Sequence, residues 1–174
     1  MISSAVRVHA TLPSPIGPLT LVAEAGQLAA LYLDAQRHRP DDDSLGSPGD
    51  PDAAPFAAAA RQLADYFAGQ LTEFDLPLAP AGTEFQRRVW AALQTIPYGQ
   101  TWSYAQLAEK IGRASAVRAV GLANGKNPIA VVIPCHRVIG SDGSLTGYGG
   151  GLDRKRFLLD LESSGSGAQA GTGE

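Results

Sequence analysis

The sequence predicts an α+β protein in which a small antiparallel sheet with one helix precedes a second, helical domain. Three observations support this prediction. Short β-rich runs separated by Pro and Gly fill the first 35 residues, helical apolar spacing dominates after residue 55, and two short helical segments joined by a Gly-containing turn follow residue 100. Because the character changes near residue 80, we expect an N-terminal domain over residues 1–79 and a C-terminal domain over residues 83–162.

The first domain opens with three expected strands. The runs "VRVHATL" and "LTLVAE" are joined by "PSPIGP", whose prolines and glycine indicate a turn, and "LAALYL" follows after "AGQ". This order predicts a meander. The next segment, residues 37–55, is polar and rich in Pro, Gly and Asp, so it lacks the apolar side chains that would order it. We expect residues 37–55 to form a mobile surface loop.

One helix completes this domain. In "PFAAAARQLADYFAG" the apolar residues Phe56, Ala60, Leu63 and Phe67 share a face, and Gly69 comes just after the expected end. A sheet with a helix packed on it accounts for residues 1–79. No catalytic constellation is visible there.

Three helices are expected after residue 82. Thr83 is a suitable N-cap for a helix whose apolar residues recur at helical spacing until Pro97. A short helix then begins at the cap residue Ser103 and ends at Gly112, and another covers "RASAVRAVGLANGKN" after a tight turn. Two short helices separated by a Gly-containing turn are typical of a helix-turn-helix, a common DNA-binding motif.

The second helix of this motif carries small side chains. Ala and Gly recur along it, and Arg118 is the long cation near its middle. Two interpretations stay open. Small side chains let a backbone approach a nucleic-acid groove closely, or they let the helix pack tightly on a neighbouring helix while Arg118 remains in solvent.

The net charge of −3 is divided unevenly between the two halves. Residues 1–79 carry four Lys and Arg against ten Asp and Glu, whereas residues 80–174 carry ten against seven. Any polyanionic partner is therefore expected to bind the second half.

Composition excludes several classes of protein. No apolar run approaches the roughly 18 residues of a transmembrane helix, and no secretory signal is visible, so we expect a cytoplasmic protein without membrane contact. The single cysteine rules out an internal disulfide and a thiolate-rich zinc site, and the three histidines lack chelating spacing. We therefore expect no metal and no cofactor. The Gly/Ser-rich tail, residues 163–174, is expected to be disordered.

The single cysteine, Cys135, follows an apolar run that predicts a short strand over residues 129–133. Such a strand would carry Cys135 into the interior, where burial disfavours the reactive thiolate. Cys135 is then either an inert buried residue or a nucleophile with polar partners. An inert buried cysteine is the more common case, but the neighbours Pro134, His136 and Arg137 suit a strand interior poorly, which weakens that interpretation and leaves both open. Adjacent residues on an extended chain point to opposite faces, so His136 needs a turn or a bridging water to reach the thiol.

The motifs "RAVGLANGKNPIAVVIPCHRVIG" and "LTGYGGGLDRKRFLLDLE" resemble the O6-alkylguanine-DNA alkyltransferase family. The resemblance covers about residues 83–162 and extends more loosely to "SPIGPLTL" and "YFAGQLTEFDLPL" in the first half. It implies a ribonuclease H-like first domain and a winged-helix-like second domain. It also implies DNA repair by irreversible, single-turnover transfer of a methyl or larger alkyl group from O6-alkylguanine, and from O4-methylthymine.

The same resemblance assigns catalytic roles. Cys135 would accept the alkyl group, and His136, held by Glu162, would take the thiol proton through a water molecule. Asn127 would hydrogen-bond the turn that carries the site. Tyr104 would give a proton to the departing guanine and crowd the DNA phosphate.

The partner implied is double-stranded DNA, bound through its minor groove by a monomer, with the damaged base flipped out because its O6 is unreachable inside a duplex. Arg118 would fill the gap left in the base stack. Further DNA or base contacts would come from Ser103, Ala119, Val138, Tyr148 and Gly149.

Gly149 stands where some members of the family carry a serine, so only its backbone could bind the base. Without the resemblance, Tyr104 could simply pack on Trp90, and Glu162 could be an ordinary helix charge. Two rival functions also remain. A damage sensor that flips the base without chemistry would not need Cys135, and a thiol hydrolase for small esters would not need the helix-turn-helix or Arg118.

Overall fold

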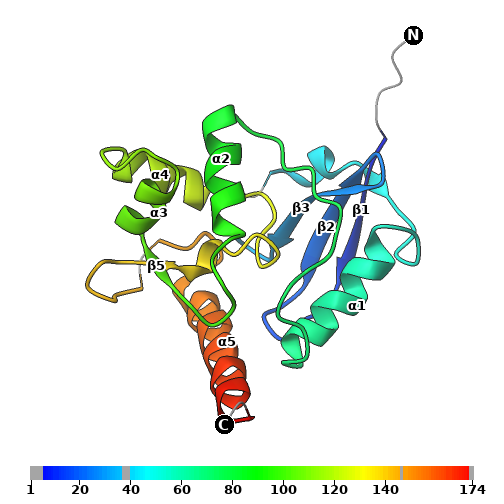
Figure 1. Ribbon diagram of the computed structural model, residues 1–174. Coiled ribbons are helices and arrows are strands. Elements are labelled where there is room, and N and C mark those ends of the chain that lie inside the picture. The colour runs from blue at the N-terminus through cyan, green and yellow to red at the C-terminus, as the bar shows by residue number, and fades with distance from the viewer. Residues whose placement is uncertain (1–5, 37–39, 146, 173–174) are drawn as a thin grey trace.

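The fold consists of an N-terminal sheet with one helix on it and a C-terminal group of helices (Figure 1). The computed structural model describes residues 6–36, 40–145 and 147–172, with side chains as far as Ser164. The predicted α+β class is confirmed.

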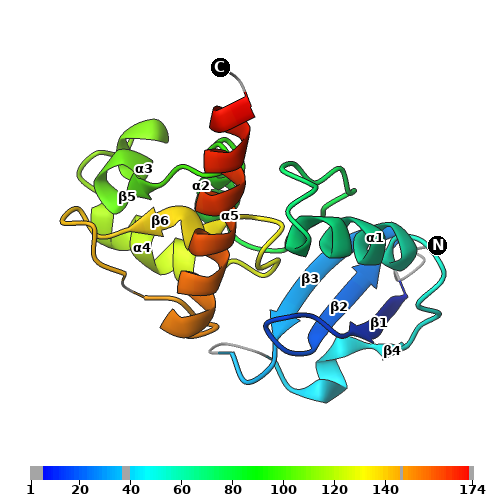
Figure 2. The same ribbon diagram turned by 90° about the horizontal axis from the view of Figure 1, so that it is seen from below.

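Three strands form the antiparallel meander that the sequence predicts. Strands β1 (Arg7–Leu12), β2 (Leu19–Glu24) and β3 (Gln27–Leu33) pair in sequence order. Helix α1 (Phe56–Phe67) lies across one face of this sheet (Figure 2). Its buried residues Phe56, Ala59, Leu63 and Tyr66 recur at three- and four-residue intervals, which places them on the side facing the sheet.

The segment over residues 37–55, expected to be a mobile surface loop, contains some local structure; its mobility stays a prediction, and residues 37–39 lie outside the described part of the chain. A 3₁₀ turn, η1 (Asp42–Leu45), leads into strand β4 (Ser47–Pro48), which pairs in parallel with β1. Leu45 is only 3% exposed because it packs in a small cluster with Val22 and Ala30 of the sheet. One apolar side chain and two ladder positions thus connect this polar segment to the sheet.

The C-terminal helices begin at the expected caps. Helix α2 (Glu84–Leu93) starts after Thr83, whose hydroxyl accepts from Gln86 N at 3.0 Å. Helix α3 (Tyr104–Lys110) starts after Ser103 in the same way, and in each case the glutamine side chain bonds back to the cap residue's N–H. Helix α4 (Val117–Gly125) follows after a turn and packs against α2 and α3.

The last helix, α5 (Leu152–Thr172), includes most of the tail predicted to be disordered. The disorder expected for residues 163–174 stays a prediction; residues 173–174 lie outside the described part of the chain. Extending an existing helix adds one hydrogen bond per residue without a new nucleation cost, which offsets the poor propensity of Gly and Ser.

The strand predicted over residues 129–133 is also wrong, because this segment is a tight turn. Ile133 N donates to Ile129 O at 2.9 Å, and Val131 has a left-handed φ of 71°. Only one bridge links it to the sheet: Leu31 N donates to Pro128 O at 2.9 Å, and Ala130 N donates to Leu31 O at 3.2 Å. The outer edge of β3 therefore anchors the segment that leads to Cys135.

One continuous cluster of buried apolar side chains joins the two halves of the molecule, from the sheet and α1 through α2 to Leu158 of α5. Two short strands, β5 (Trp102–Ser103) and β6 (Val138–Ile139), pair in parallel between these helices. Among the described residues, none of the helices is both long enough and apolar enough to span a bilayer.

Candidate active site

The segment from Asn127 to Val138, called here the active-site turn, is held by a buried asparagine. Asn127 Nδ2 donates to Ile133 O at 2.7 Å, and its Oδ1 accepts from Ile129 N at 3.0 Å. These two bonds replace the ladder bonds that a strand would have provided. The structure therefore places Asn127 at the turn that, according to the resemblance, it would hydrogen-bond.

Cys135 begins a short 3₁₀ helix, η2 (Cys135–Arg137), at the end of this turn. The chain thus bends at the point where an extended strand would have separated Cys135 from His136. Cys135 is 7% exposed. Burial raises the pKa of its thiol, while a hydrogen bond from Asn127 and the charge of Lys155 act in the opposite direction. A thiol with a raised pKa needs a base before it can attack an electrophile.

His136 and Glu162 form the hydrogen bond expected of a base and its orienting carboxylate. His136 is completely buried, and its Nε2 lies 2.7 Å from Glu162 Oε2. Arg137 completes the group, since its Nε donates to Glu162 Oε1 at 2.7 Å and Nη2 donates to Glu162 Oε2 at 3.0 Å. Its remaining bond, from Nη1 to Ile96 O at 2.7 Å, ties the group to the end of α2.

The charge state of this group determines which nitrogen of His136 can act as a base. Burial would raise the pKa of Glu162, but the hydrogen bonds and charges of His136 and Arg137 outweigh it and hold the pKa at about 2. An ionised carboxylate only accepts hydrogen bonds, so His136 Nε2 must carry the proton between them. Burial lowers the pKa of His136, which keeps the ring neutral at pH 7. Nδ1 therefore has a lone pair, and it has no hydrogen-bond partner among the described residues.

Two buried residues at this site were not anticipated from the sequence. Lys155 of α5 is fully buried and donates from Nζ to Val138 O at 2.6 Å, and burial lowers its pKa to about 8. Tyr66 of α1 donates its hydroxyl to Glu162 Oε2 at 2.6 Å. The spacing of Lys155, Leu158 and Glu162 along one helix face could have revealed the lysine. No local pattern marks Tyr66, which is 96 residues from Glu162.

The residues expected to line a base pocket lie around β6 and the following loop. Val138 is fully buried, and Gly149 is half-buried. Tyr148 is 7% exposed, and its hydroxyl has no hydrogen-bond partner within the described residues. The neighbouring Gly150 must lack a side chain, because a Cβ there would collide with Leu33 of β3 and with the Tyr148 ring. The loop is thus pressed against the same strand that anchors the active-site turn.

The residues expected to contact DNA lie on the helix-turn-helix. On α4, Arg118 and Ala119 are exposed, and Leu122 is 64% exposed although it is apolar. Tyr104 is half-buried at the start of α3, beside α4: a Cβ on Gly121 would lie 3.6 Å from its ring. Ser103 caps α3.

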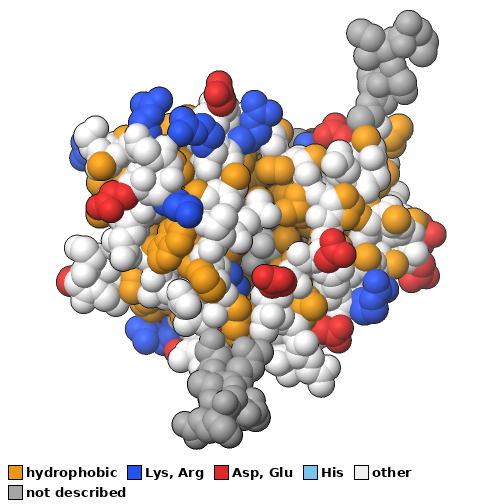
Figure 3. Space-filling view, in the orientation of Figure 1, with side chains coloured by type: hydrophobic (Ala, Val, Ile, Leu, Met, Phe, Trp, Pro, Cys, Tyr) orange, Lys and Arg blue, Asp and Glu red, His pale blue; other side chains and the backbone are white. Residues whose placement is uncertain are grey.

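Helix α4 leaves both interpretations of its small residues open. One face, with Val120, Ala123 and Asn124, is buried against the neighbouring helices, and the other is exposed. Basic side chains gather over α2–α4 in Figure 3. The exposed basic residues of these helices and of the turns after them are Arg87, Arg88, Lys110, Arg113, Arg118 and Lys126.

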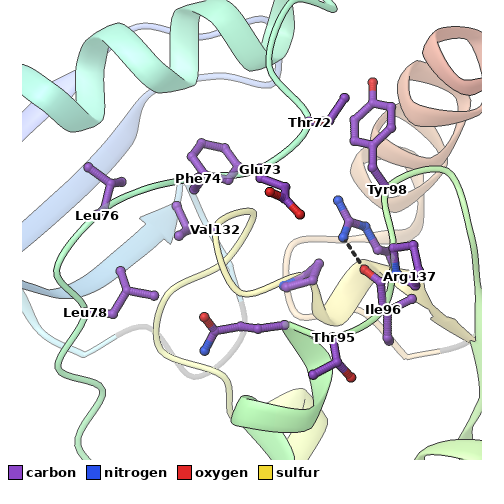
Figure 4. Close-up of a pocket in the computed structure, with 13 residues that line it drawn as sticks. Thr72, Glu73, Phe74, Leu76, Leu78, Thr95, Ile96, Tyr98, Val132 and Arg137 are labelled. Atoms are coloured by element: carbon purple, nitrogen blue, oxygen red, sulfur yellow. Dashed lines mark hydrogen bonds between the residues drawn. The ribbon is translucent and has the colours of Figure 1, made fainter. Parts of the chain in front are cut away.

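A separate cavity of about 420 Å³ lies on the other side of the active-site turn (Figure 4). It is bounded by the segment that links the two halves, by the end of α2, and by Val132, Pro134 and Arg137 of the turn. Neither Cys135 nor His136 is among its lining residues. This cavity is therefore not the pocket in which a substrate would meet the thiol.

Comparison with known proteins assigns the family. Residues 8–80 match the ribonuclease-like domain of 6-O-methylguanine DNA methyltransferases, and residues 84–164 match the DNA-binding domain of the same proteins. The chain belongs to the 6-O-methylguanine DNA methyltransferase family. It is accordingly a member of an enzyme family of methyltransferases, as the sequence motifs predicted.

Individual relatives are similar over most of their length. The methylated-DNA–protein-cysteine methyltransferase of Mycolicibacterium paratuberculosis is 58% identical over 154 residues, which is 88% of this chain and 91% of the relative. That of Methanosarcina acetivorans is 50% identical over 157 residues, which is 90% of this chain and 98% of the relative. The crystal structure of Mycobacterium tuberculosis OGT in complex with DNA superposes with a TM-score of 0.85 at 54% identity, over 91% of this chain and 94% of that one.

Proposed function

We propose that this protein repairs DNA by transferring an alkyl group from O6-alkylguanine in duplex DNA to Cys135. The observation that carries the proposal is the His136–Glu162 hydrogen bond of 2.7 Å, which leaves the lone pair on Nδ1 of the residue that directly follows the buried Cys135. Family membership and the DNA complex of the Mycobacterium tuberculosis relative support the choice of substrate.

In the proposed reaction, Cys135 Sγ attacks the alkyl carbon on O6 of guanine. A carbon–sulfur bond forms as the carbon–oxygen bond breaks. The thiol proton passes through a water molecule to His136 Nδ1, and Glu162 stabilises the imidazolium that forms. The electron pair of the broken bond stays with guanine, which takes a proton from the Tyr104 hydroxyl.

The proposed docking uses α4 in the minor groove of the duplex. Small side chains such as Ala119 allow close approach, Ser103 contacts the DNA beside them, and Arg118 occupies the gap left when the damaged base rotates out. Flipping is required because the alkylated oxygen cannot be reached inside the helix. Val138, Tyr148 and Gly149 then line the base pocket, and Asn127 holds the turn in place.

The protein is proposed to act as a monomer. Each molecule is proposed to react once, because a thioether is a poor leaving group and the alkyl group therefore stays on Cys135. O4-methylthymine is proposed as a second substrate, since it presents the same alkyl–oxygen bond to the thiol. The protein would then be a stoichiometric reagent.

Intact mass with peptide mapping, after incubation with a duplex that carries one O6-methylguanine, tests this function. The expected result is one methyl group on Cys135, with repair stopping at one lesion per protein molecule. An unchanged mass with tight binding would instead identify a damage sensor. Repeated turnover of a small soluble ester, with no methyl on Cys135, would identify a hydrolase.

A further inference from the structure

The hydroxyl of Tyr66 brings one group from the first domain into the site of the second. Tyr66 lies in the last turn of α1, within the ribonuclease-like stretch at residues 8–80, whereas Glu162 lies in the DNA-binding stretch at residues 84–164. The hydroxyl donates to Glu162 Oε2 at 2.6 Å, and Tyr66 is 0% exposed. The two domains therefore share a buried hydrogen bond at the carboxylate that orients His136.

Aromatic packing fixes the ring that carries this hydroxyl. The ring centroid of Tyr66 lies 5.3 Å from those of Phe67 and Phe74 and 6.3 Å from that of Tyr98, with edge-on or tilted geometry. Burial raises the pKa of Tyr66, so its hydroxyl stays protonated and remains a donor at every pH of interest. The hydroxyl is thus always a hydrogen-bond donor, and the packed ring holds it in one position.

Three donors converge on the same carboxylate oxygen. Glu162 Oε2 receives the Tyr66 hydroxyl at 2.6 Å, His136 Nε2 at 2.7 Å and Arg137 Nη2 at 3.0 Å. A carboxylate oxygen has about two lone-pair sites, so these donors compete for its charge. Removing one of them strengthens the others.

We propose that Tyr66 is a positioning residue that acts through Glu162 to limit the basicity of His136. The inference rests on the proposed function, in which His136 takes the thiol proton. Without the Tyr66 hydroxyl, fewer donors share the negative charge of Glu162 Oε2. The hydrogen bond from His136 Nε2–H then becomes stronger, which stabilises the imidazolium. A larger fraction of His136 is then already protonated on the acid side of neutrality, and less of it can act as a base there.

Other charged or titratable groups also face His136 and Glu162, and they are unchanged by substitution of Tyr66. They come from η2, from α5, from the segment after α2 and from the loop before α5: Arg137, Lys155, Tyr98 and Tyr148. A shift confined to Tyr66 variants is therefore attributable to this one hydroxyl.

The test compares single-turnover transfer from an O6-methylguanine duplex, across pH, for the wild type, Tyr66→Phe and Phe56→Leu. Phe56 is buried in the same helix and is not a member of the hydrogen-bonded group, so its variant controls for lost stability. For Tyr66→Phe we expect the acid limb of the profile to move up by about 0.5–1 pH unit. The loss of rate should be greatest at acid pH, up to about tenfold for a shift of one pH unit, should be no more than about threefold at pH 7, and should disappear at higher pH. Phe56→Leu should leave the limb in place.

An NMR titration of the His136 ring provides a readout that does not depend on transfer. The pKa of His136 should rise in Tyr66→Phe and fall when 3-fluorotyrosine, a stronger donor, replaces Tyr66. An unmoved His136 titration, or an equal displacement in Phe56→Leu, would overturn the role of Tyr66. If the wild type transfers no alkyl group while the titration moves as expected, the proposed function fails and the coupling of Tyr66 to His136 stands.

Discussion

The active-site turn and the exposed face of α4 belong to the same domain but are built in opposite ways. All residues of the turn except Pro128 are buried, and the side chains of Asn127, His136 and Arg137 are hydrogen-bonded to the backbone or to Glu162 of α5. The outward face of α4 carries Arg118, Ala119 and Leu122, all exposed. The contrast matches the two tasks of the proposed function, because proton transfer needs side chains held in place, whereas docking on a duplex needs an accessible backbone and little side-chain bulk.

This difference predicts that substitutions in the turn will affect the transfer reaction and the folding stability. Substitutions on the exposed face of α4 should affect only the binding and repair of DNA. The largest effect is expected for Cys135→Ser. A serine hydroxyl is a far weaker nucleophile than a thiolate, so transfer should fall by at least about 10³-fold. Binding to the alkylated duplex should be retained, because Cys135 lies inside the protein and α4 is unchanged. Intact mass and gel-shift titration measure the two properties, and loss of both together would contradict the separation.

Glu162→Gln tests the electrostatics of the buried group. The folded pKa of Glu162 is about 2, against an ordinary value of 4.5. Because the folded pKa is depressed, the ionised carboxylate stabilises the protein above about pH 4.5, and this contribution of about 3 kcal/mol is lost as pH falls towards 2. Glu162→Gln should lose about that amount at pH 7 and show a flatter pH dependence between pH 4.5 and 2.

Urea unfolding at pH 7 and pH 3 provides the measurement for Glu162→Gln. Asp160→Asn is a matched control, because Asp160 is exposed on the same helix. Its unfolding free energy should stay within about 0.5 kcal/mol of the wild type. A similar loss in both variants would mean that helix charge alone, and not the buried group, sets the stability.

Arg118→Ala tests whether the exposed face of α4 acts on DNA by extruding the damaged base. If Arg118 fills the gap left by the flipped base, its removal should slow repair of duplex DNA by about tenfold. Reaction with the free base O6-benzylguanine should remain near the wild-type rate, since no base must be extruded. Rates are followed by intact mass in both cases. Equal losses on the two substrates would count against a role in base extrusion.

The smallest effect is expected for Ala119→Gln. Ala119 is exposed, so the folded state should change by less than about 0.5 kcal/mol. The added bulk should weaken DNA binding if α4 enters a groove. Ala91→Gln, at an exposed position of α2, is the matched control. Equal affinities for the two variants would show that the small residues of α4 do not serve close approach to DNA.

Features that depend on neighbouring residues were predictable. The caps Thr83 and Ser103, the meander and the helix-turn-helix all follow from patterns within a few residues, and each is present. The pairing of His136 with Glu162 came from a family resemblance rather than from spacing. The distance between their atoms confirms that the two side chains meet.

Features that depend on distant residues were missed or wrong. The run over residues 129–133 has the composition of a strand, but Asn127 and the edge of β3 supply bonds that fold it into a turn. In the polar segment, Leu45 packs against Val22 and Ala30 of the sheet, a contact that its composition did not predict. In both segments a few tertiary contacts outweigh local propensity.

The sequence by itself determined the class of fold, the limits of most helices and the identity of the residue that can react, because these depend on periodicity, capping and the chemistry of one thiol. Only the tertiary structure decided which charged groups and hydrogen-bond donors surround the site of that thiol. Tyr66, Arg137 and Lys155 come from three separate elements, and their charges and donors converge on one buried site. Such convergence arises when the chain folds and water is excluded from the interior, because buried polar groups must then form hydrogen bonds within the protein.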